Sequence, residues 1–312
     1  MKAMVIHQYG GAEQLQLAEV PLPIPGEGQV RIKVAAAGVN PVDFHVRNGL
    51  LKDTGTHQLP LVLGWDAAGV IDALGTGVQA WQPGQEVMVF APIGGQGCYA
   101  EYICVDADLL AAKPSQLSMT EAAAVPLAAV TAWQGLFKAG QLQPGQRVYI
   151  HGASGGVGGF AVQLAKARGA FVYASCSARS RDYVASLGAD VCLDYQQQDF
   201  AEQLTELDLL FACVGGNQVL PRALPTLKSG GRLISTFDEI DPALAQAQGV
   251  DYQRMWVQPS GADLKQLAEL LQSGQLRVQL DQVWPLHQAR EALARSESGR
   301  ALGKVVLQLA AD

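Results

Sequence analysis

A glycine-rich segment near the middle of the chain has the composition and spacing of an anion-binding loop. It reads His-Gly-Ala-Ser-Gly-Gly-Val-Gly-Gly over residues 151–159, directly after the β-branched and aromatic run 148–150. Apolar residues at helical spacing follow over 160–167, and a second strand-like run covers 170–174. This order of strand, tight turn, helix and strand is typical of a dinucleotide site, where backbone N–H groups at a helix N-terminus hold a pyrophosphate. Larger side chains in the turn would hold the anion away.

The segment after the second predicted strand carries hydroxyl and guanidinium groups. It contains Ser175, Ser177, Arg179 and Arg181, with no carboxylate before Asp182. A site for NAD usually offers Asp or Glu here to the ribose 2′-OH, whereas arginine can hold a 2′-phosphate through two hydrogen bonds. We therefore expect NADPH as the cofactor. The alternative is that both arginines are solvated, although a cation at a helix N-terminus is mildly unfavourable without an anion.

The composition excludes several classes of partner. The 312 residues leave room for two domains, and 49% hydrophobic with 16% charged residues is typical of a folded protein with a sizeable core. The net charge of −7 and the lack of a basic run argue against nucleic acid and anionic membranes. The N-terminus shows no secretory or transit pattern, and the five cysteines lack Cys-x-x-Cys spacing. We expect free thiols and a cytoplasmic location.

The predicted elements change character along the chain. Residues 1 to about 120 contain short alternating runs separated by turn signals, which indicates a partly open β-barrel. From Thr120, the expected N-cap of an alanine-rich helix, helices alternate with strands and predict a parallel sheet. A strand beginning at Lys304 must pair with something, and we predict that it returns to the first domain. The predicted domains are 1–121 with 261–312, and 122–260 for the dinucleotide.

Five stretches together resemble the medium-chain dehydrogenase/reductase superfamily in its zinc-independent quinone oxidoreductase branch. They are residues 37–49, 63–70, 97–102, 124–133 and the glycine turn 153–159. The resemblance covers the whole chain and implies an α/β protein, with a Rossmann doubly wound parallel sheet and a GroES-like β-barrel domain. It also implies an active site in the cleft between the domains, and a homodimer.

Two positions argue against the zinc of the alcohol dehydrogenases in this superfamily. Asn40 stands where those enzymes carry a catalytic cysteine, and Gly64-Trp65-Asp66 replaces their Gly-His-Glu. An amide and an indole cannot replace a thiolate and an imidazole as zinc ligands. Without a Lewis acid, quinones and α,β-unsaturated carbonyls are the better hydride acceptors, because negative charge spreads over a conjugated system.

The resemblance also implies roles for individual residues. Asn40 would face the nicotinamide, Thr131 the ribose or phosphates, and Lys304 would fall near the cleft. His45 stands where many quinone reductases have tyrosine. It could donate a hydrogen bond or a proton to the substrate, or be a surface histidine while solvent supplies the proton. The expected catalytic residues are Asn40, His45 and Lys304. The expected cofactor residues are Asn40, Thr131, Gly152, Ala153, Ser154, Gly155, Gly156, Val157, Ser177, Arg179, Tyr195, Val214 and Gly215.

Other nearby side chains have simpler interpretations. Trp65 is expected to be a core aromatic rather than a stacking surface for substrate. Asp43 and Arg47 lie four residues apart and could pair on one helical turn. Tyr99 and Tyr102 are expected to pack within the barrel.

These features predict an NADPH-dependent reductase that passes hydride to a quinone or an enone without a metal. The alternative is a non-catalytic NADPH-binding protein, such as a sensor or a crystallin-like protein. The combination of Asn40, Thr131 and a full phosphate turn favours the enzyme, because a scaffold has no need to position nicotinamide. A third hypothesis, a domain binding S-adenosylmethionine, is disfavoured by Arg179 and by the N-terminal barrel.

Overall fold

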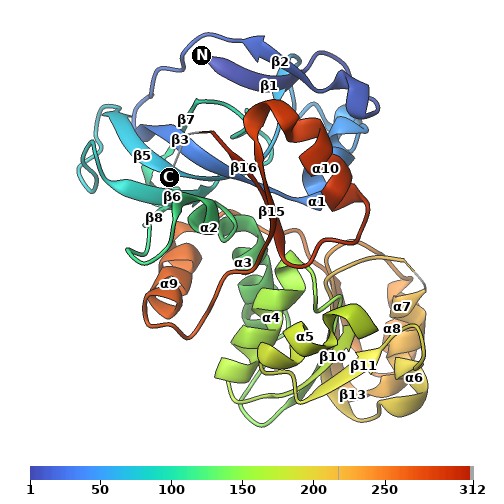
Figure 1. The fold of residues 1–312 in the computed structure, drawn as a ribbon. Coiled ribbons are helices and arrows are strands. Elements are labelled where there is room, and N and C mark those ends of the chain that lie inside the picture. The colour runs from blue at the N-terminus through green and yellow to red at the C-terminus, as the bar shows by residue number, and fades with distance from the viewer. Residues whose placement is uncertain (217, 310–312) are drawn as a thin grey trace. The chain divides into compact units, whose positions relative to one another are not determined.

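The computed structural model describes residues 1–216 and 218–309, which form two compact units (Figure 1). Unit 1 contains Met1–Val130 and Gln258–Asp312, and unit 2 contains Thr131–Val257. The first boundary falls later than the predicted one after residue 121, and the second slightly earlier than the one after residue 260. Residues 310–312 of the predicted first domain lie outside the described residues. Unit 2 is inserted in the sequence of unit 1.

Unit 1 is built around two sheets. Its strands are β1 (Lys2–Ile6), β2 (Gln16–Glu19), β3 (Gln29–Val39), β4 (Leu61–Val62), β5 (Asp66–Leu74), β6 (Glu86–Phe90), β7 (Tyr102–Asp106), β8 (Leu110–Ala112), β15 (Leu280–Pro285) and β16 (Lys304–Gln308). The smaller sheet has the order β2-β1-β4, and the larger has the order β15-β16-β3-β5-β6-β8 with β7 also on β3. The terminal strand β16 pairs antiparallel with β3, so it belongs to the sheet of unit 1.

The register around β3 brings together residues that are distant in the sequence. Along one edge, Gly38 of β3 is opposite Asp66 of β5, and along the other, Val39 is opposite Val305 of β16. Lys304, one residue before Val305, therefore lies beside the end of β3. Gly38 is required here, because a Cβ would lie 2.4 Å from the carbonyl oxygen of Ala123.

The helices of unit 1 cover the sheets and connect them to unit 2. They are α1 (Pro41–Arg47), α2 (Met119–Ala123), α3 (Pro126–Trp133), α9 (Gly261–Gln272) and α10 (Ala289–Glu297), where α3 ends in unit 2. The predicted N-cap Thr120 is wrong. Ser118 caps α2 instead, because its Oγ accepts from the N–H of Glu121 at 3.2 Å while the Glu121 carboxylate accepts from the N–H of Ser118 at 2.9 Å.

Unit 2 has a single six-stranded parallel sheet. Its strands are β9 (Arg147–His151), β10 (Phe171–Cys176), β11 (Val191–Asp194), β12 (Leu207–Ala212), β13 (Leu227–Ser235) and β14 (Asp251–Arg254). The spatial order β11-β10-β9-β12-β13-β14 reverses direction after β9, as expected for the doubly wound sheet of a dinucleotide-binding domain. Its helices are α4 (Gly156–Ala167), α5 (Arg181–Ser186), α6 (Phe200–Gln203), α7 (Val219–Ala223) and α8 (Pro242–Ala247). The predicted parallel sheet is therefore confirmed.

Short turns complete the chain. The single-turn 3₁₀ helices are η1 (Ala12–Gln14), η2 (Lys52–Thr54), η3 (Ala107–Leu109), η5 (Ala178–Ser180), η6 (Leu224–Thr226) and η7 (Leu286–Gln288), and η4 (Gln134–Ala139) is a π-helix that continues α3. Among the described helices, none combines the length and apolar character needed to cross a membrane.

Candidate cofactor and catalytic sites

The predicted cofactor residues of unit 2 follow the ends of four neighbouring strands. The glycine turn follows β9, Ser177 and Arg179 follow β10, Tyr195 follows β11, and Val214 with Gly215 follows β12. Because these strands are parallel, their carboxyl ends meet at one edge of the sheet. The reversal of strand order falls at this edge, between β9 and β12, where ligands bind in open α/β sheets.

The glycine turn is held tightly against the sheet. Gly152 has a φ of +82°, and a Cβ there would lie 2.9 Å from Cγ2 of Val214. The Gly152 N–H donates to Oγ of Ser175 at 2.8 Å, which ties the turn to β10. A Cβ on Gly158 would lie 2.2 Å from the Gly152 carbonyl oxygen, so the first turn of α4 can approach the loop only without a side chain.

The opening of α4 leaves room for an anion. Gly155 is its N-cap, and a Cβ there would meet nothing closer than the Gly152 carbonyl oxygen at 3.5 Å. Ala153 is buried, whereas residues 154–157 are half-buried. The first N–H groups of a helix have no carbonyl partner within it and carry partial positive charge. The turn therefore fits the pyrophosphate of a dinucleotide.

The end of β10 presents groups suited to a second anion. Ser175 is buried and holds the turn, while the backbone N–H of Ser177 donates to Oγ of Ser180 at 3.1 Å. Arg179 is exposed, as is Tyr195 at the end of the next strand. Serine hydroxyls and an exposed guanidinium suit a 2′-phosphate better than a ribose hydroxyl.

The predicted residue Thr131 and the neighbouring His151, both in unit 2, have different surroundings. Thr131 lies in α3 and is buried. His151 at the end of β9 is also largely buried, and burial, reinforced by the nearby Arg222 charge, lowers its pKa to about 4. His151 is therefore neutral near pH 7 and adds no positive charge to the turn.

A buried polar cluster in unit 1 contains Asn40, Asp66 and Lys304. The Asn40 amide nitrogen Nδ2 donates to Oδ2 of Asp66 at 2.9 Å, and Lys304 Nζ donates to Oδ1 of Asn40. Nζ also donates to the carbonyl oxygen of Val39 at 3.0 Å and lies 3.5 Å from Oδ2 of Asp66. Burial raises the pKa of Asp66 and lowers the pKa of Lys304, and their mutual attraction opposes both shifts. Lys304 Nζ has three acceptors, one for each N–H bond of an ammonium, so Lys304 and Asp66 form an ion pair.

Asp43 anchors the backbone of the same segment. Its Oδ2 accepts from the Asn40 N–H at 2.8 Å and from the Tyr99 hydroxyl at 2.6 Å. Its Oδ1 is buried and has no hydrogen-bond partner in the part of the chain that the structure describes. Burial raises the pKa of Asp43 to about 7, against the opposing effect of the Tyr99 hydrogen bond. Tyr99 therefore does more than fill the barrel.

The structure corrects the suggested pairing of Asp43 with Arg47. Asp43 faces Asn40 and Tyr99, whereas Nη2 of Arg47 lies 3.2 Å from Oε2 of Glu297 in α10. On the same helix, His45 is half-buried, and burial lowers its pKa despite the nearby Glu297 charge. His45 is therefore predominantly neutral at pH 7.

Trp65 is a fully buried aromatic, as expected. Its indole Nε1–H donates to the carbonyl oxygen of Gly95 at 3.3 Å, and its ring stacks on His57 with centroids 5.9 Å apart. His57 Nε2 in turn bonds to the Ile93 carbonyl oxygen at 2.5 Å. These contacts connect Trp65 to the loop after β6.

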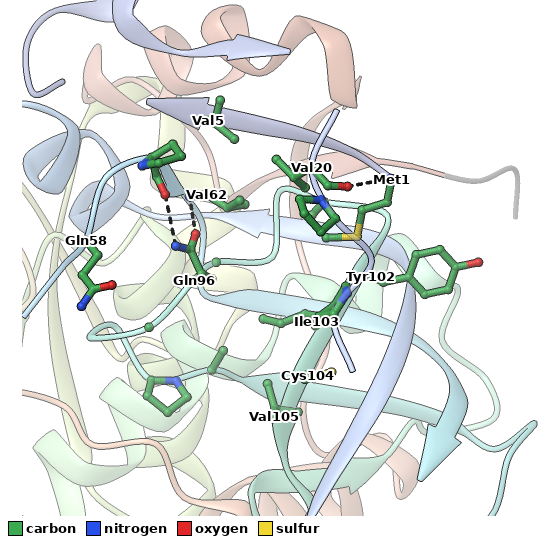
Figure 2. Close-up of a pocket in the computed structure, with 18 of the residues that line it drawn as sticks. Met1, Val5, Val20, Gln58, Val62, Gln96, Tyr102, Ile103, Cys104 and Val105 are labelled. Carbon is green, nitrogen blue, oxygen red and sulfur yellow. Dashed lines mark hydrogen bonds between the residues drawn. The ribbon is translucent and has the colours of Figure 1, made fainter. Parts of the chain in front are cut away.

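Unit 1 also contains a cavity of about 650 Å³, whose lining does not include Asn40, Asp66 or Lys304. Figure 2 shows residues that line it. Its wall includes Val62, Ile103 and Val105, and the Gln96 amide bridges the Val62 N–H (2.8 Å) and the Pro60 carbonyl oxygen (3.2 Å). Among the described residues that line this cavity, none is a predicted catalytic or cofactor residue. Its size alone assigns it no role.

Comparisons with known proteins agree with this architecture. Residues 26–115 match the family described as alcohol dehydrogenase GroES-like domain, and residues 187–307 match the family described as zinc-binding dehydrogenase. The chain is 35% identical to the mouse mitochondrial NAD(P)H oxidoreductase RTN4IP1, over 99% of this chain and 89% of the mouse protein. It is 36% identical to 2-methylene-furan-3-one reductase of Solanum lycopersicum, over 98% of this chain and 79% of that protein.

A solved structure shows the same fold throughout. The quinone oxidoreductase from Coxiella burnetii superimposes with a TM-score of 0.93 at 32% identity, covering 99% of each chain. The fold is therefore a GroES-like domain combined with a Rossmann sheet. The chain belongs to the medium-chain dehydrogenase/reductase superfamily, in its quinone oxidoreductase branch.

Proposed function

We propose that this protein is an NADPH-dependent, zinc-independent oxidoreductase that transfers hydride to a quinone or an α,β-unsaturated carbonyl. The observation that carries the proposal is the convergence of the glycine turn with the ends of β10, β11 and β12 at one edge of the sheet of unit 2. Relatives described as an NAD(P)H oxidoreductase, a furanone reductase and a quinone oxidoreductase support the same class of reaction.

The residues of this edge divide between the pyrophosphate and the 2′-phosphate of the cofactor. The amides of Ser154, Gly156 and Val157 would hold the pyrophosphate, since the Gly155 N–H already donates to the Gly152 carbonyl oxygen at 3.2 Å. Ser177 with Arg179 would hold the 2′-phosphate. When bound, NADPH supplies the hydride. The exposed side chains of Tyr195 and Val214 would flank the cofactor.

One matching family is described as zinc-binding. The residues that replace the catalytic cysteine and the Gly-His-Glu of the zinc alcohol dehydrogenases, namely Asn40 and Gly64-Trp65-Asp66, nevertheless do not fit zinc. Asn40 and Asp66 are both bonded to the ammonium of Lys304, and the Trp65 indole donates its N–H and has no lone pair for a metal. Zinc needs three protein ligands with free lone pairs around an open position. In the described ranges, no group of three His, Cys, Asp or Glu residues is arranged to hold a metal ion.

A conjugated acceptor suits a site of this composition. Hydride addition to a quinone or an enone leaves a delocalised anion, which needs hydrogen-bond donors and positioning more than a Lewis acid. Asn40 would position the nicotinamide, and solvent would supply the proton, with His45 as the alternative donor. Homodimer formation and a cytoplasmic location remain predictions from the sequence.

The proposal is tested by following NADPH oxidation with purified protein and a panel of benzoquinones, naphthoquinones and alkenals. We expect turnover with NADPH that is unchanged by a strong chelator. NADPH binding measured in parallel by fluorescence separates the alternatives. Tight binding without turnover on any acceptor would overturn the reductase and support the non-catalytic NADPH-binding protein.

A further inference from the structure

Three strands place one amide between one carboxylate and one ammonium. Asn40 directly follows β3, Asp66 begins β5 and Lys304 begins β16. The registers of β3 with both neighbours bring these three residues to the same end of the sheet. Each is almost inaccessible to solvent, with Asn40 2%, Asp66 0% and Lys304 4% exposed.

The two neighbours leave the Asn40 carboxamide a single orientation. An ammonium can only donate hydrogen bonds, and an ionised carboxylate can only accept them. Oδ1 of Asn40 must therefore face Lys304, and Nδ2 must face Asp66. A rotation of the amide by 180° would place Nδ2 against the ammonium and Oδ1 against the carboxylate, and both contacts would be repulsive.

The hydrogen bonds of Lys304 are all directed into the protein. Val39, Asn40 and Asp66 supply an acceptor for each of its three N–H bonds. A buried ion pair of this kind is weak evidence for stability, because desolvation offsets most of its attraction. The arrangement therefore needs another explanation, and the orientation of Asn40 supplies one.

We propose that Lys304, together with Asp66, is a positioning residue that holds the carboxamide of Asn40 in one orientation. Oδ1 also faces the backbone N–H of Asp43 in the capping box of α1, so the remaining Nδ2–H bond is the group that Asn40 can then offer to a ligand. Lys304 acts through Asn40 and does not itself touch substrate or transfer a proton. The consequence for turnover rests on the proposed reductase function, whereas the orientation itself does not.

The chain offers an unusually direct test, because it contains only three asparagines, at positions 40, 48 and 217. Selective ¹⁵N-asparagine labelling gives three side-chain amide signals, which Asn48→Asp and Asn217→Asp assign by elimination. In Lys304→Met we expect the Asn40 amide pair to shift and broaden while the other two pairs stay in place. Lys304→Arg, which keeps a donor, should restore a sharp pair. An unchanged Asn40 pair in Lys304→Met would overturn the proposal.

Lys113→Met is the matched control. Lys113 is also a lysine of unit 1 whose side chain is only 6% exposed, but its ammonium pairs with Glu86 at 3.1 Å and donates to the carbonyl oxygens of Pro114 and Leu117. The Lys113→Met variant should therefore keep the Asn40 signals and the turnover of the wild type. If Lys304→Met does not fold, the variant carrying both Lys304→Met and Asp66→Leu removes the two charges together. Leucine rather than asparagine is used at position 66, because a new asparagine would add a fourth labelled amide. The variant should show the same Asn40 change, and unchanged Asn40 signals there would also overturn the proposal.

Kinetics then separate this inference from the proposed function. In Lys304→Met, loss of the fixed Asn40 orientation should lower kcat by about tenfold to a hundredfold. NADPH affinity should change little, because the residues proposed to bind its phosphates lie in unit 2. A wild-type protein without reductase activity would refute the proposed function and leave the amide test intact. A displaced Asn40 signal with unchanged kcat in an active enzyme would overturn the positioning role.

Discussion

Asp66 and Lys304 are 238 residues apart in the sequence, and Oδ2 of the carboxylate lies 3.5 Å from Nζ of the ammonium. Neither side chain is appreciably exposed, and Asn40 bonds to both. A charge pair removed from solvent in this way is sensitive to the loss of either partner, because the remaining charge has no water to solvate it.

The first prediction concerns the stability of this pair. Lys304→Met and Asp66→Leu should each lower the free energy of unfolding by about 3–5 kcal/mol, because each leaves one buried charge without its partner. The loss of unfolding free energy in the double variant should be much smaller than the sum of the losses in the two single variants. Urea unfolding of all four proteins completes the cycle, and strictly additive effects would contradict an ionic pair.

The second prediction concerns pH. The pKa of Asp43 is raised from 3.8 to about 7 by burial, so between these values the folded state holds a proton that the unfolded state has released. Stability should therefore fall as pH rises through this window, at up to about 1.4 kcal/mol per pH unit from this group alone. Urea unfolding at several pH values should show a shallower decline for Asp43→Asn, whose side chain cannot ionise. If the free energy of unfolding fell equally with pH in the wild type and in Asp43→Asn, Asp43 would not be the source of the decline.

The third prediction separates folding from binding in the glycine turn. Gly158→Ala should lower the melting temperature, because its Cβ would lie 2.2 Å from the Gly152 carbonyl oxygen. Gly155→Ala meets nothing closer than 3.5 Å and should keep the wild-type melting temperature. It should nevertheless weaken NADPH binding by about 1–3 kcal/mol, since its methyl group would stand where the pyrophosphate approaches the amides. Equal NADPH affinity for Gly155→Ala and the wild type would place the phosphates elsewhere.

The fourth prediction concerns cofactor preference. Arg179→Ala should weaken NADPH binding by about 1–3 kcal/mol through loss of a charge-assisted contact, with little effect on NADH. Titration of each nucleotide against the wild type and the variant gives the preference ratio directly. Arg168→Ala, an exposed arginine at the C-cap of α4, serves as the control because it lies at the opposite end of that helix from the glycine turn. An unchanged ratio for Arg179→Ala would exclude this residue from the 2′-phosphate site.

The fifth prediction concerns the proton. Since burial lowers the pKa of His45, the imidazole is a poor source of protons at neutral pH. We expect His45→Gln to retain kcat within about threefold, whereas loss of a general acid would cost about a hundredfold or more. A hundredfold loss with unchanged NADPH affinity would instead assign proton delivery to His45.

The cofactor turn could be predicted because its signal is local. Strand, glycine turn, helix and strand follow one another within 148–174, and each has its own periodicity. The helix start at Thr120 was misassigned for an equally local reason. The true cap, Ser118, lies two residues before the expected cap position, and its reciprocal pairing with Glu121 is a pattern that is readable in the sequence.

The cluster around Asn40 could not be assembled from the sequence. The sequence predicts Asn40 and Lys304 as separate site residues, whereas Asp66 is notable there only as a replacement for glutamate and Tyr99 only as a packing residue. Their contacts depend on the registers of β3 with β5 and β16, which only the folded sheet defines. Asp43 and Arg47 show the same limitation, since helical spacing allowed a pair while tertiary contacts drew the two side chains to different partners.

The placement of Lys304 on β16 has a consequence for how the protein is made. During synthesis, Asn40 and Asp66 leave the ribosome long before Lys304, with all of unit 2 between them. Until β16 pairs with β3, the Asp66 carboxylate lacks its counter-charge and the larger sheet lacks two strands. Because contacts so distant in sequence form slowly, unit 2 can fold as the chain emerges, whereas unit 1 must wait for its final strands. Nascent chains should therefore acquire a folded dinucleotide-binding unit before their reaction site is complete.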